Sequence, residues 1–219
     1  MPKPKPEWLA LLEAQLKEFP RQNIYTLATT EHGQPRVRHV VHRGVSPSGL
    51  LLSTTDTRMP KLAQIAQQPA VEAAWLFQTS LVQFRIRGDA FAVGPDGMPS
   101  TGAPVDADSP EAAAAWWADE RARLFQSGIG DYLRATFARP APPGSLLADA
   151  PPPDTWPAAV PPEATTPEQH AALELARAHF AVLAIVPRRV EILELRTSPH
   201  RRREWVLGSE GWVQTDLVP

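Results

Sequence analysis

The sequence predicts a mainly β fold, an antiparallel barrel into which helices are inserted. Short β-branched and aromatic segments follow one another early in the chain, helices then come in a block, and strand-like segments return at the end. A parallel sheet would instead need a crossover helix between successive strands. We therefore expect the late strands to pair with the early ones.

The first half of the chain begins with a helix and continues in strands. Trp8, Leu12, Leu16 and Phe19 recur at helical spacing, and Pro20 ends the run. The strand-like segments of this half are 24–30, 35–41, 50–54, 71–77 and 81–93, with turns at 32–34 and 44–49 and a short helix at 61–67.

The second half carries the inserted helices and the late strands. Helices are expected at 110–125, 129–137 and 168–178, and strands at 180–186, 190–195, 204–207 and 212–217. Ten of the 25 prolines fall between Pro140 and Pro167, so a proline-rich surface loop is expected at about 139–167. Trp156 within it suggests that this loop docks on the protein.

Composition excludes several classes of function. The 219 residues suit a single domain over 1–219, and a net charge of −2 gives no global attraction to nucleic acid or acidic membranes. No cysteine is present, which excludes disulfides, thiol nucleophiles and cysteine metal sites. His39 and His42 lack a carboxylate cluster, so we expect no metal site. Without a signal-peptide pattern or a membrane span, a cytoplasmic protein is expected.

Basic and hydroxyl side chains gather at one strand-to-helix junction. Thr55, Arg58 and Lys61 surround the expected start of the helix at 61–67, where unpaired backbone N–H groups favour an anion. The alternative is a solvated charged face with helix-capping residues. The preceding strand carries Arg38 and Arg43, which have opposite strand parity and would need a bulge or a strand end between them to face one ligand.

A second polar set lies on the segment 81–93. Gln83, Arg85 and Arg87 alternate with apolar residues, as on a half-buried strand. They either face water or line a cleft for a polar ring. The residues do not decide between the two readings.

The ordered set Arg38-x-x-x-x-Arg43, Gly49, Thr55-Asp56-x-Arg58-x-x-Lys61, Pro69-x-Val71 and Gln83 resembles the flavin-binding half of the pyridoxamine 5'-phosphate oxidase family. The segment 127–132 is similar to the S-x-I-G-x-W segment of true oxidases, and 180–219 to the C-terminal dimerisation segment. The resemblance implies an FMN-binding split barrel, a homodimer with FMN at the interface, and hydride transfer from a small molecule to the flavin.

The resemblance also implies roles for individual residues. The implied cofactor-binding residues are Arg38, Arg43, Thr55, Arg58, Lys61, Gln83 and Arg203. The implied substrate-binding residues are Arg43, Arg123, Ser127 and Arg201. No catalytic residue is assigned.

The sequence departs from true oxidases at positions that bind the substrate. No tyrosine stands near Trp117 or Asp119, and the segment 198–205 has no R-x-H motif. Leu193 stands where a flavin-stacking tryptophan is expected. Three hypotheses follow: an FMN-dependent oxidoreductase with another small substrate, a true pyridoxamine 5'-phosphate oxidase making pyridoxal 5'-phosphate, and a non-catalytic flavin-binding or apo scaffold.

Overall fold

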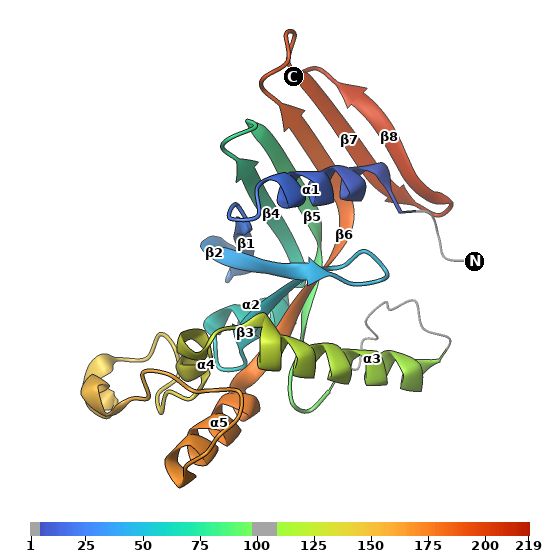
Figure 1. Cartoon of the computed structure of the whole chain (residues 1–219). Coiled ribbons are helices and arrows are strands. Elements are labelled where there is room, and N and C mark those ends of the chain that lie inside the picture. Colours follow the sequence, from blue (N-terminus) through green and yellow to red (C-terminus); the bar gives the residue numbers. More distant parts are fainter. Residues whose placement is uncertain (1–4, 98–108) are drawn as a thin grey trace. The chain divides into compact units, whose positions relative to one another are not determined.

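The computed structural model describes residues 5–97 and 109–219, and Figure 1 labels its helices and strands along the chain. The α-helices are α1 (Glu7–Glu18), α2 (Pro60–Gln67), α3 (Pro110–Arg123), α4 (Asp131–Phe137) and α5 (Pro167–His179). The strands are β1 (Ile24–Glu31), β2 (Gln34–Val45), β3 (Leu51–Asp56), β4 (Ala70–Phe77), β5 (Val82–Val93), β6 (Phe180–Glu194), β7 (Arg201–Gly208) and β8 (Gly211–Leu217).

The strands form one eight-stranded sheet in the order β3-β2-β1-β4-β5-β6-β7-β8. β3 also pairs with β6, so six strands form a closed ring of pairings and β7 and β8 extend it. The pairs β1–β2, β1–β4, β4–β5, β6–β7 and β7–β8 are all antiparallel. The predicted barrel, with the late strands joined to the early ones, is confirmed.

The chain divides into two compact units, which are treated separately below. The first contains residues 1–52, 67–90 and 185–219, and the second contains residues 53–66 and 91–184. β3, β5 and β6 run through both units.

The core of the first unit is aromatic. Tyr25, Trp75 and Phe77 are almost completely buried, and the Trp75 ring contacts both of the others. Trp8 of α1 packs edge-on against Trp212 of β8, with 5.3 Å between ring centroids. These contacts bury the apolar stripe of α1 that the sequence predicted, and such burial stabilises an amphipathic helix.

One strand prediction is wrong. Segments 180–186 and 190–195 are a single strand, β6, which passes through Pro187. Proline removes one ladder donor but keeps an extended backbone. On the neighbouring strand, a Cβ at Gly88 would lie 2.0 Å from the Val186 carbonyl oxygen. The missing side chain of Gly88 therefore allows β6 to continue at close approach.

Other element boundaries shift by a few residues. β2 continues to Val45, into the expected turn, and α3 ends at Arg123, where a π-helical segment (Leu124–Gly128) follows. β7 begins at Arg201, earlier than expected. Arg202 and Arg203 pair there with glutamates of β6, at 2.7 Å and 3.2 Å, and these cross-strand pairs extend the ladder.

The helices of the second unit are organised around Arg134, which is 1% exposed. Its guanidinium donates to the carbonyl oxygens of Phe125, Gln126 and Ile129 and, at 2.7 Å, to that of Val160. It also pairs with the Asp131 carboxylate at 2.8 Å. The Phe125 and Gln126 carbonyls belong to the π-helical segment, and the guanidinium satisfies them where the α-helical pattern is interrupted.

The segment 139–167 has little regular structure, as predicted, apart from two single 3₁₀ turns (Leu147–Asp149 and Pro153–Thr155). It is nevertheless packed against α4 of the same unit. Val160 is 1% exposed, and its backbone N–H donates to Asp131. The Arg139 guanidinium lies 5.4 Å from the centroid of the Trp156 ring. The expected docking of the loop is seen at Val160, whereas Trp156 contacts Arg139 and, through its Nε1, the Pro151 carbonyl oxygen at 3.0 Å, both within the loop itself.

Candidate functional site

β2 carries the basic side chains that the sequence singled out. It runs in register with β1 from Gln34 to Val41, and the alternation of its burial, with Val40 and His42 buried, puts Arg38 and Arg43 on opposite faces. The Nη1 of Arg38 donates to the Thr29 hydroxyl at 2.5 Å and to the Arg36 carbonyl at 3.1 Å. Burial lowers the pKa of Arg38, and the Glu31 charge opposes this shift. The Arg38 guanidinium is therefore bonded to groups of β1 and β2, the two strands that pair at this point.

Arg43 is in a different situation. Its guanidinium is half-buried, and its buried Nε has no hydrogen-bond partner among the described residues. Burial lowers the pKa of Arg43, since desolvation disfavours the charged form. A partly buried cation in this state would be stabilised by an anionic group supplied by a ligand.

The end of β3 forms a tight polar corner in the second unit. Thr55 and Asp56 are each 3% exposed. The Asp56 carboxylate accepts from the backbone N–H of Arg58 at 2.8 Å, from its Nε at 3.0 Å and from its Nη2 at 2.7 Å. Arg58 also donates to the Arg139 carbonyl at 2.9 Å. Arg58 thus ties this corner to the end of α4.

Lys61 lies in the first turn of α2, as expected, but the backbone donors around it are partly occupied. The N–H of Thr57 donates to the His179 carbonyl at 2.7 Å, and that of Met59 to the Asp56 carbonyl at 3.1 Å. The second unit therefore brings Thr55, Arg58 and Lys61 to one strand-to-helix junction. Their contact with a phosphate stays a prediction.

The implied substrate residues Arg123 and Ser127 lie at the join between α3 and the π-helical segment. The Ser127 hydroxyl donates to the Arg123 carbonyl at 3.0 Å. The Arg123 side chain bonds to Glu120, which raises its pKa. The backbone brings these two residues together, and the Arg123 guanidinium has a carboxylate partner.

Arg201 and Arg203 lie on β7, in the first unit. Arg203 pairs with Glu7 of α1 at 2.9 Å and with Glu194 at 3.2 Å, and its guanidinium lies 5.2 Å from the centroid of the Trp205 ring. Arg201 is exposed. The structure thus holds Arg203 between α1 and β6 by two carboxylates.

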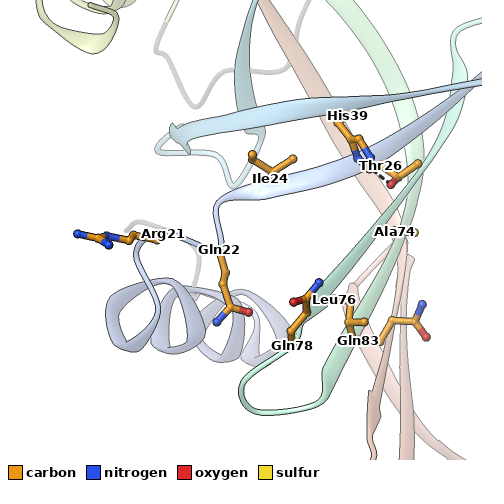
Figure 2. A pocket seen from close by; sticks show the side chains of 9 residues that line it. All are labelled: Arg21, Gln22, Ile24, Thr26, His39, Ala74, Leu76, Gln78 and Gln83. Carbon is orange, nitrogen blue, oxygen red and sulfur yellow. Dashed lines mark hydrogen bonds between the residues drawn. The ribbon is translucent and has the colours of Figure 1, made fainter.

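Gln83 borders a cavity of about 530 Å³ on the outward face of the first unit's sheet (Figure 2). His39 of β2 and Thr26 of β1 lie on its wall, and His39 Nδ1 is 3.2 Å from the Thr26 hydroxyl. The wall also includes Arg21, Gln22, Ile24, Ala74, Leu76 and Gln78. Of the two readings left open for Gln83, the cleft is the one that the structure supports.

Arg85 and Arg87, the other polar residues of this strand face, have a different role. They form salt bridges with Glu191 at 3.1 Å and with Glu72 at 3.2 Å. Sequence reasoning singled out Gln83 but missed Arg21, Gln22 and Gln78. They lie just before β1 and just after β4, and the pairing of β1 with β4 brings them together, which no local sequence pattern indicates.

The predicted site residues are divided between the two units. Arg38, Arg43, Gln83, Arg201 and Arg203 belong to the first unit, and Thr55, Arg58, Lys61, Arg123 and Ser127 to the second. Within the described residues, no group of three or more acidic, histidine or cysteine side chains could hold a metal ion. No helix in the described part of the chain is long and apolar enough to cross a membrane.

Comparison with known proteins supports the fold. The fold is that of the split barrels, and residues 5–94 match the family described as "Pyridoxamine 5'-phosphate oxidase, FMN-binding domain". The predicted resemblance to this family is confirmed. No curated protein matches the chain.

Two solved structures are similar to the chain over nearly their whole length. One is a pyridoxamine 5'-phosphate oxidase-related, FMN-binding protein from Nostoc punctiforme, with 24% identity and a TM-score of 0.72, covering 98% of each chain. The other is PhzG from Burkholderia lata in complex with tetrahydrophenazine-1-carboxylic acid, with 16% identity and a TM-score of 0.64. It covers 99% of this chain and 95% of PhzG. At these identities the likeness establishes the fold.

Proposed function

We propose that this protein binds FMN and is an oxidoreductase that acts on a small molecule. The observation that carries the proposal is the half-buried guanidinium of Arg43. It lies inside the matched segment 5–94, and its buried Nε has no partner among the described residues. Arg58, Arg123 and Arg203 each have a carboxylate partner, whereas Arg43 has none in the described part of the chain. The charge and the unpartnered Nε–H donor of Arg43 therefore fit an anionic cofactor.

The other residues have roles that follow from their chemistry. Lys61 and Arg38 would add charge-assisted bonds to the FMN phosphate, with Thr55 donating its hydroxyl. Arg58 would contribute through its remaining donors, and Gln83 would bond the edge of the isoalloxazine ring. Arg203 would reach the flavin only after giving up Glu7 or Glu194. Bound FMN would supply the two-electron oxidation of the substrate.

The first experiment is the visible spectrum of the purified protein before and after FMN is added. We expect flavin bands that stay with the protein after desalting. Because charge-assisted bonds contribute about 1.5–3 kcal/mol each, Arg43→Ala, Arg38→Ala and Lys61→Ala should each weaken FMN binding by roughly ten-fold or more. Arg36→Ala is the matched control, since Arg36 is exposed on the same strand and pairs with Glu31.

Three results would contradict this proposal. Protein that takes up no added FMN would favour the apo scaffold. Unchanged FMN affinity in Arg43→Ala would remove Arg43 from the site. Retained FMN without turnover of any tested substrate would favour a non-catalytic flavin carrier.

A true pyridoxamine 5'-phosphate oxidase is the competing activity. Arg123, Ser127 and Arg201 would then grip the substrate phosphate, with Arg43 beside the reacting group. Turnover of pyridoxamine 5'-phosphate by the FMN-loaded protein, lost in Arg201→Ala and Arg123→Ala, would establish it.

The proposed assembly is a homodimer with FMN at the interface. Apolar side chains on the open sheet face, such as Ile24 and Leu76, are 51% and 45% exposed and are compatible with burial by a second copy. Light scattering on the eluting protein at several concentrations would measure the assembly. The cytoplasmic location stays a prediction from the sequence.

A further inference from the structure

We propose that His179 is a positioning residue for the FMN phosphate, because it holds Arg58 from two sides at the junction between β3 and α2. The start of the proline-rich segment, residues 139–145, supports the same junction. This inference deepens the proposed function and rests on it, since that proposal places the phosphate at this junction. All the residues that carry the inference belong to the second unit.

The Arg58 guanidinium is bonded on most of its donors. Its Nε and Nη2 donate to the Asp56 carboxylate at 3.0 Å and 2.7 Å, and its Nη1 donates to the Arg139 carbonyl at 2.9 Å. Nη2 also donates to the Phe137 carbonyl at 3.5 Å. Of the five guanidinium N–H groups, the one without an acceptor among the described residues is therefore on Nη1. The acceptors of the other four fix the direction of this remaining donor.

The two backbone acceptors of Arg58 come from the end of α4. Carbonyl groups at the end of a helix have no partner within the helix, so they need donors from elsewhere. Phe137 is the last residue of α4. Its carbonyl oxygen also accepts from the ring of His179, because Nδ1 lies 2.8 Å away and a carbonyl can only accept. His179 and Arg58 thus share one acceptor.

His179 also fixes the backbone that leads into Arg58. It is the last residue of α5, and its own carbonyl oxygen accepts from the N–H of Thr57 at 2.7 Å. One residue therefore anchors the chain just before Arg58 through its backbone, and an acceptor of the guanidinium through its ring. A donor that is already held in one direction loses less conformational freedom when it binds a ligand. The ring bond of His179 should therefore strengthen the bond from Arg58 to a phosphate.

The proline-rich segment supports the junction at two further points. Arg139, whose carbonyl bonds Arg58, has its guanidinium 5.4 Å from the centroid of the Trp156 ring. Gly144, at a φ of +94°, lies against Pro60, the first residue of α2, since a Cβ there would be 3.6 Å from Pro60 Cγ. The segment thus contacts the start of α2 and restrains the residue that supplies an acceptor to Arg58.

The test compares FMN with riboflavin, which has the same ring system and lacks the phosphate. Fluorescence titration of the flavin-free, full-length protein measures both affinities, and their ratio reports the contribution of the phosphate. His179→Leu should lower the preference for FMN by at least about five-fold, because a charge-assisted bond contributes roughly ten-fold or more and would be weakened. His179→Asn, which keeps an N–H donor close to the position of Nδ1, should restore most of the preference.

A double-mutant cycle tests whether His179 acts through Arg58. In the Arg58→Ala protein, the further change His179→Leu should alter the ratio by no more than about two-fold, since the side chain that it positions is gone. Trp156→Leu should lower the ratio by about two- to five-fold, in line with an exposed cation–π contact. His170→Leu is the matched control, because His170 is an exposed histidine of the same helix. It should leave the ratio unchanged.

Several results would overturn the proposal. An unchanged ratio in His179→Leu, even with a loss of stability, would show that His179 is only structural. Independent, additive effects of His179→Leu and Arg58→Ala would show that His179 does not act through Arg58. An unchanged ratio in Trp156→Leu would overturn the part assigned to the proline-rich segment. Wild-type protein that binds FMN and riboflavin equally would overturn this inference and leave flavin binding standing, whereas wild-type protein that binds no FMN would refute the proposed function itself.

Discussion

Two regions of this molecule use arginine in opposite ways. In the second unit, Arg134 is 1% exposed, and four backbone carbonyls and the Asp131 carboxylate surround its guanidinium. In the first unit, Arg43 is half-buried and has a buried Nε without a partner among the described residues. The fold satisfies the hydrogen-bond donors of Arg134 and leaves the Nε donor of Arg43 available to a ligand. Satisfied polarity marks a structural arginine, and unsatisfied polarity marks a candidate binding residue.

The largest expected effect is the loss of stability when Arg134, whose hydrogen bonds the fold satisfies, is replaced. Arg134→Met should lower the free energy of unfolding by about 3–5 kcal/mol, because the buried carbonyls would lose their donor and Asp131 its partner. Urea denaturation measures the change. Arg123→Met is the control for stability: its pair with Glu120 is solvent-exposed on the arginine side, so a loss within about 1 kcal/mol is expected. Similar losses in the two variants would break the comparison.

The next largest effect is a pH dependence of stability, which tests whether burial also disfavours the charged form of His42. His42 is 8% exposed and packs 5.1 Å from the Trp75 ring, and burial lowers its pKa to about 4. Between pH 6.5 and about 4 the unfolded chain therefore binds a proton that the folded chain does not. Stability should fall as the pH drops through this window, by about 3 kcal/mol in total.

Urea midpoints of the wild type and of His42→Phe between pH 7.5 and 4 measure this contribution. Phenylalanine keeps an aromatic contact with Trp75 and cannot titrate. The difference in stability between the two proteins should change with pH, to the disadvantage of the wild type in acid. Parallel pH curves would show that His42 is not desolvated in the fold.

A smaller effect is expected at Arg58, which lies between the two extremes. Its guanidinium is tied to Asp56 and to the Arg139 carbonyl, while the resemblance also assigns it to the FMN phosphate. Arg58→Ala should cost about 1–3 kcal/mol of stability, because Asp56 is 3% exposed and would lose its partner. If stability falls and FMN affinity is unchanged, Arg58 is a structural tie; if FMN affinity falls at constant stability, the phosphate role is the main one.

The smallest effect on stability is expected at Arg43. Removing a half-buried cation that has no partner among the described residues should change the free energy of unfolding by no more than about 1 kcal/mol, and it relieves a desolvation cost. FMN affinity should nevertheless fall by roughly ten-fold or more. A large loss of stability in Arg43→Ala without FMN would show that Arg43 is structural like Arg134.

Much of this fold could be read from local sequence pattern. The helical spacing of Trp8, Leu12 and Leu16 predicted α1, because one apolar stripe must face a core. The alternation around Phe84 and Ile86 predicted β5, since successive strand residues point to opposite faces. The cluster of prolines likewise predicted the irregular segment at 139–167, because proline cannot supply regular backbone bonds.

The sequence by itself determined the periodicities, the proline-rich segment and the basic motif that resembles a flavin site, because each depends on neighbours a few residues apart. Tertiary structure decided the rest. β6 continues through Pro187 because Gly88 of another strand leaves room for it. Arg58 and Arg203 are paired while Arg43 has no partner among the described residues, and Gln83 borders a cavity while Arg85 forms an ion pair with Glu191. Which charges are neutralised depends on contacts between residues far apart in the chain, and local patterns do not encode such contacts.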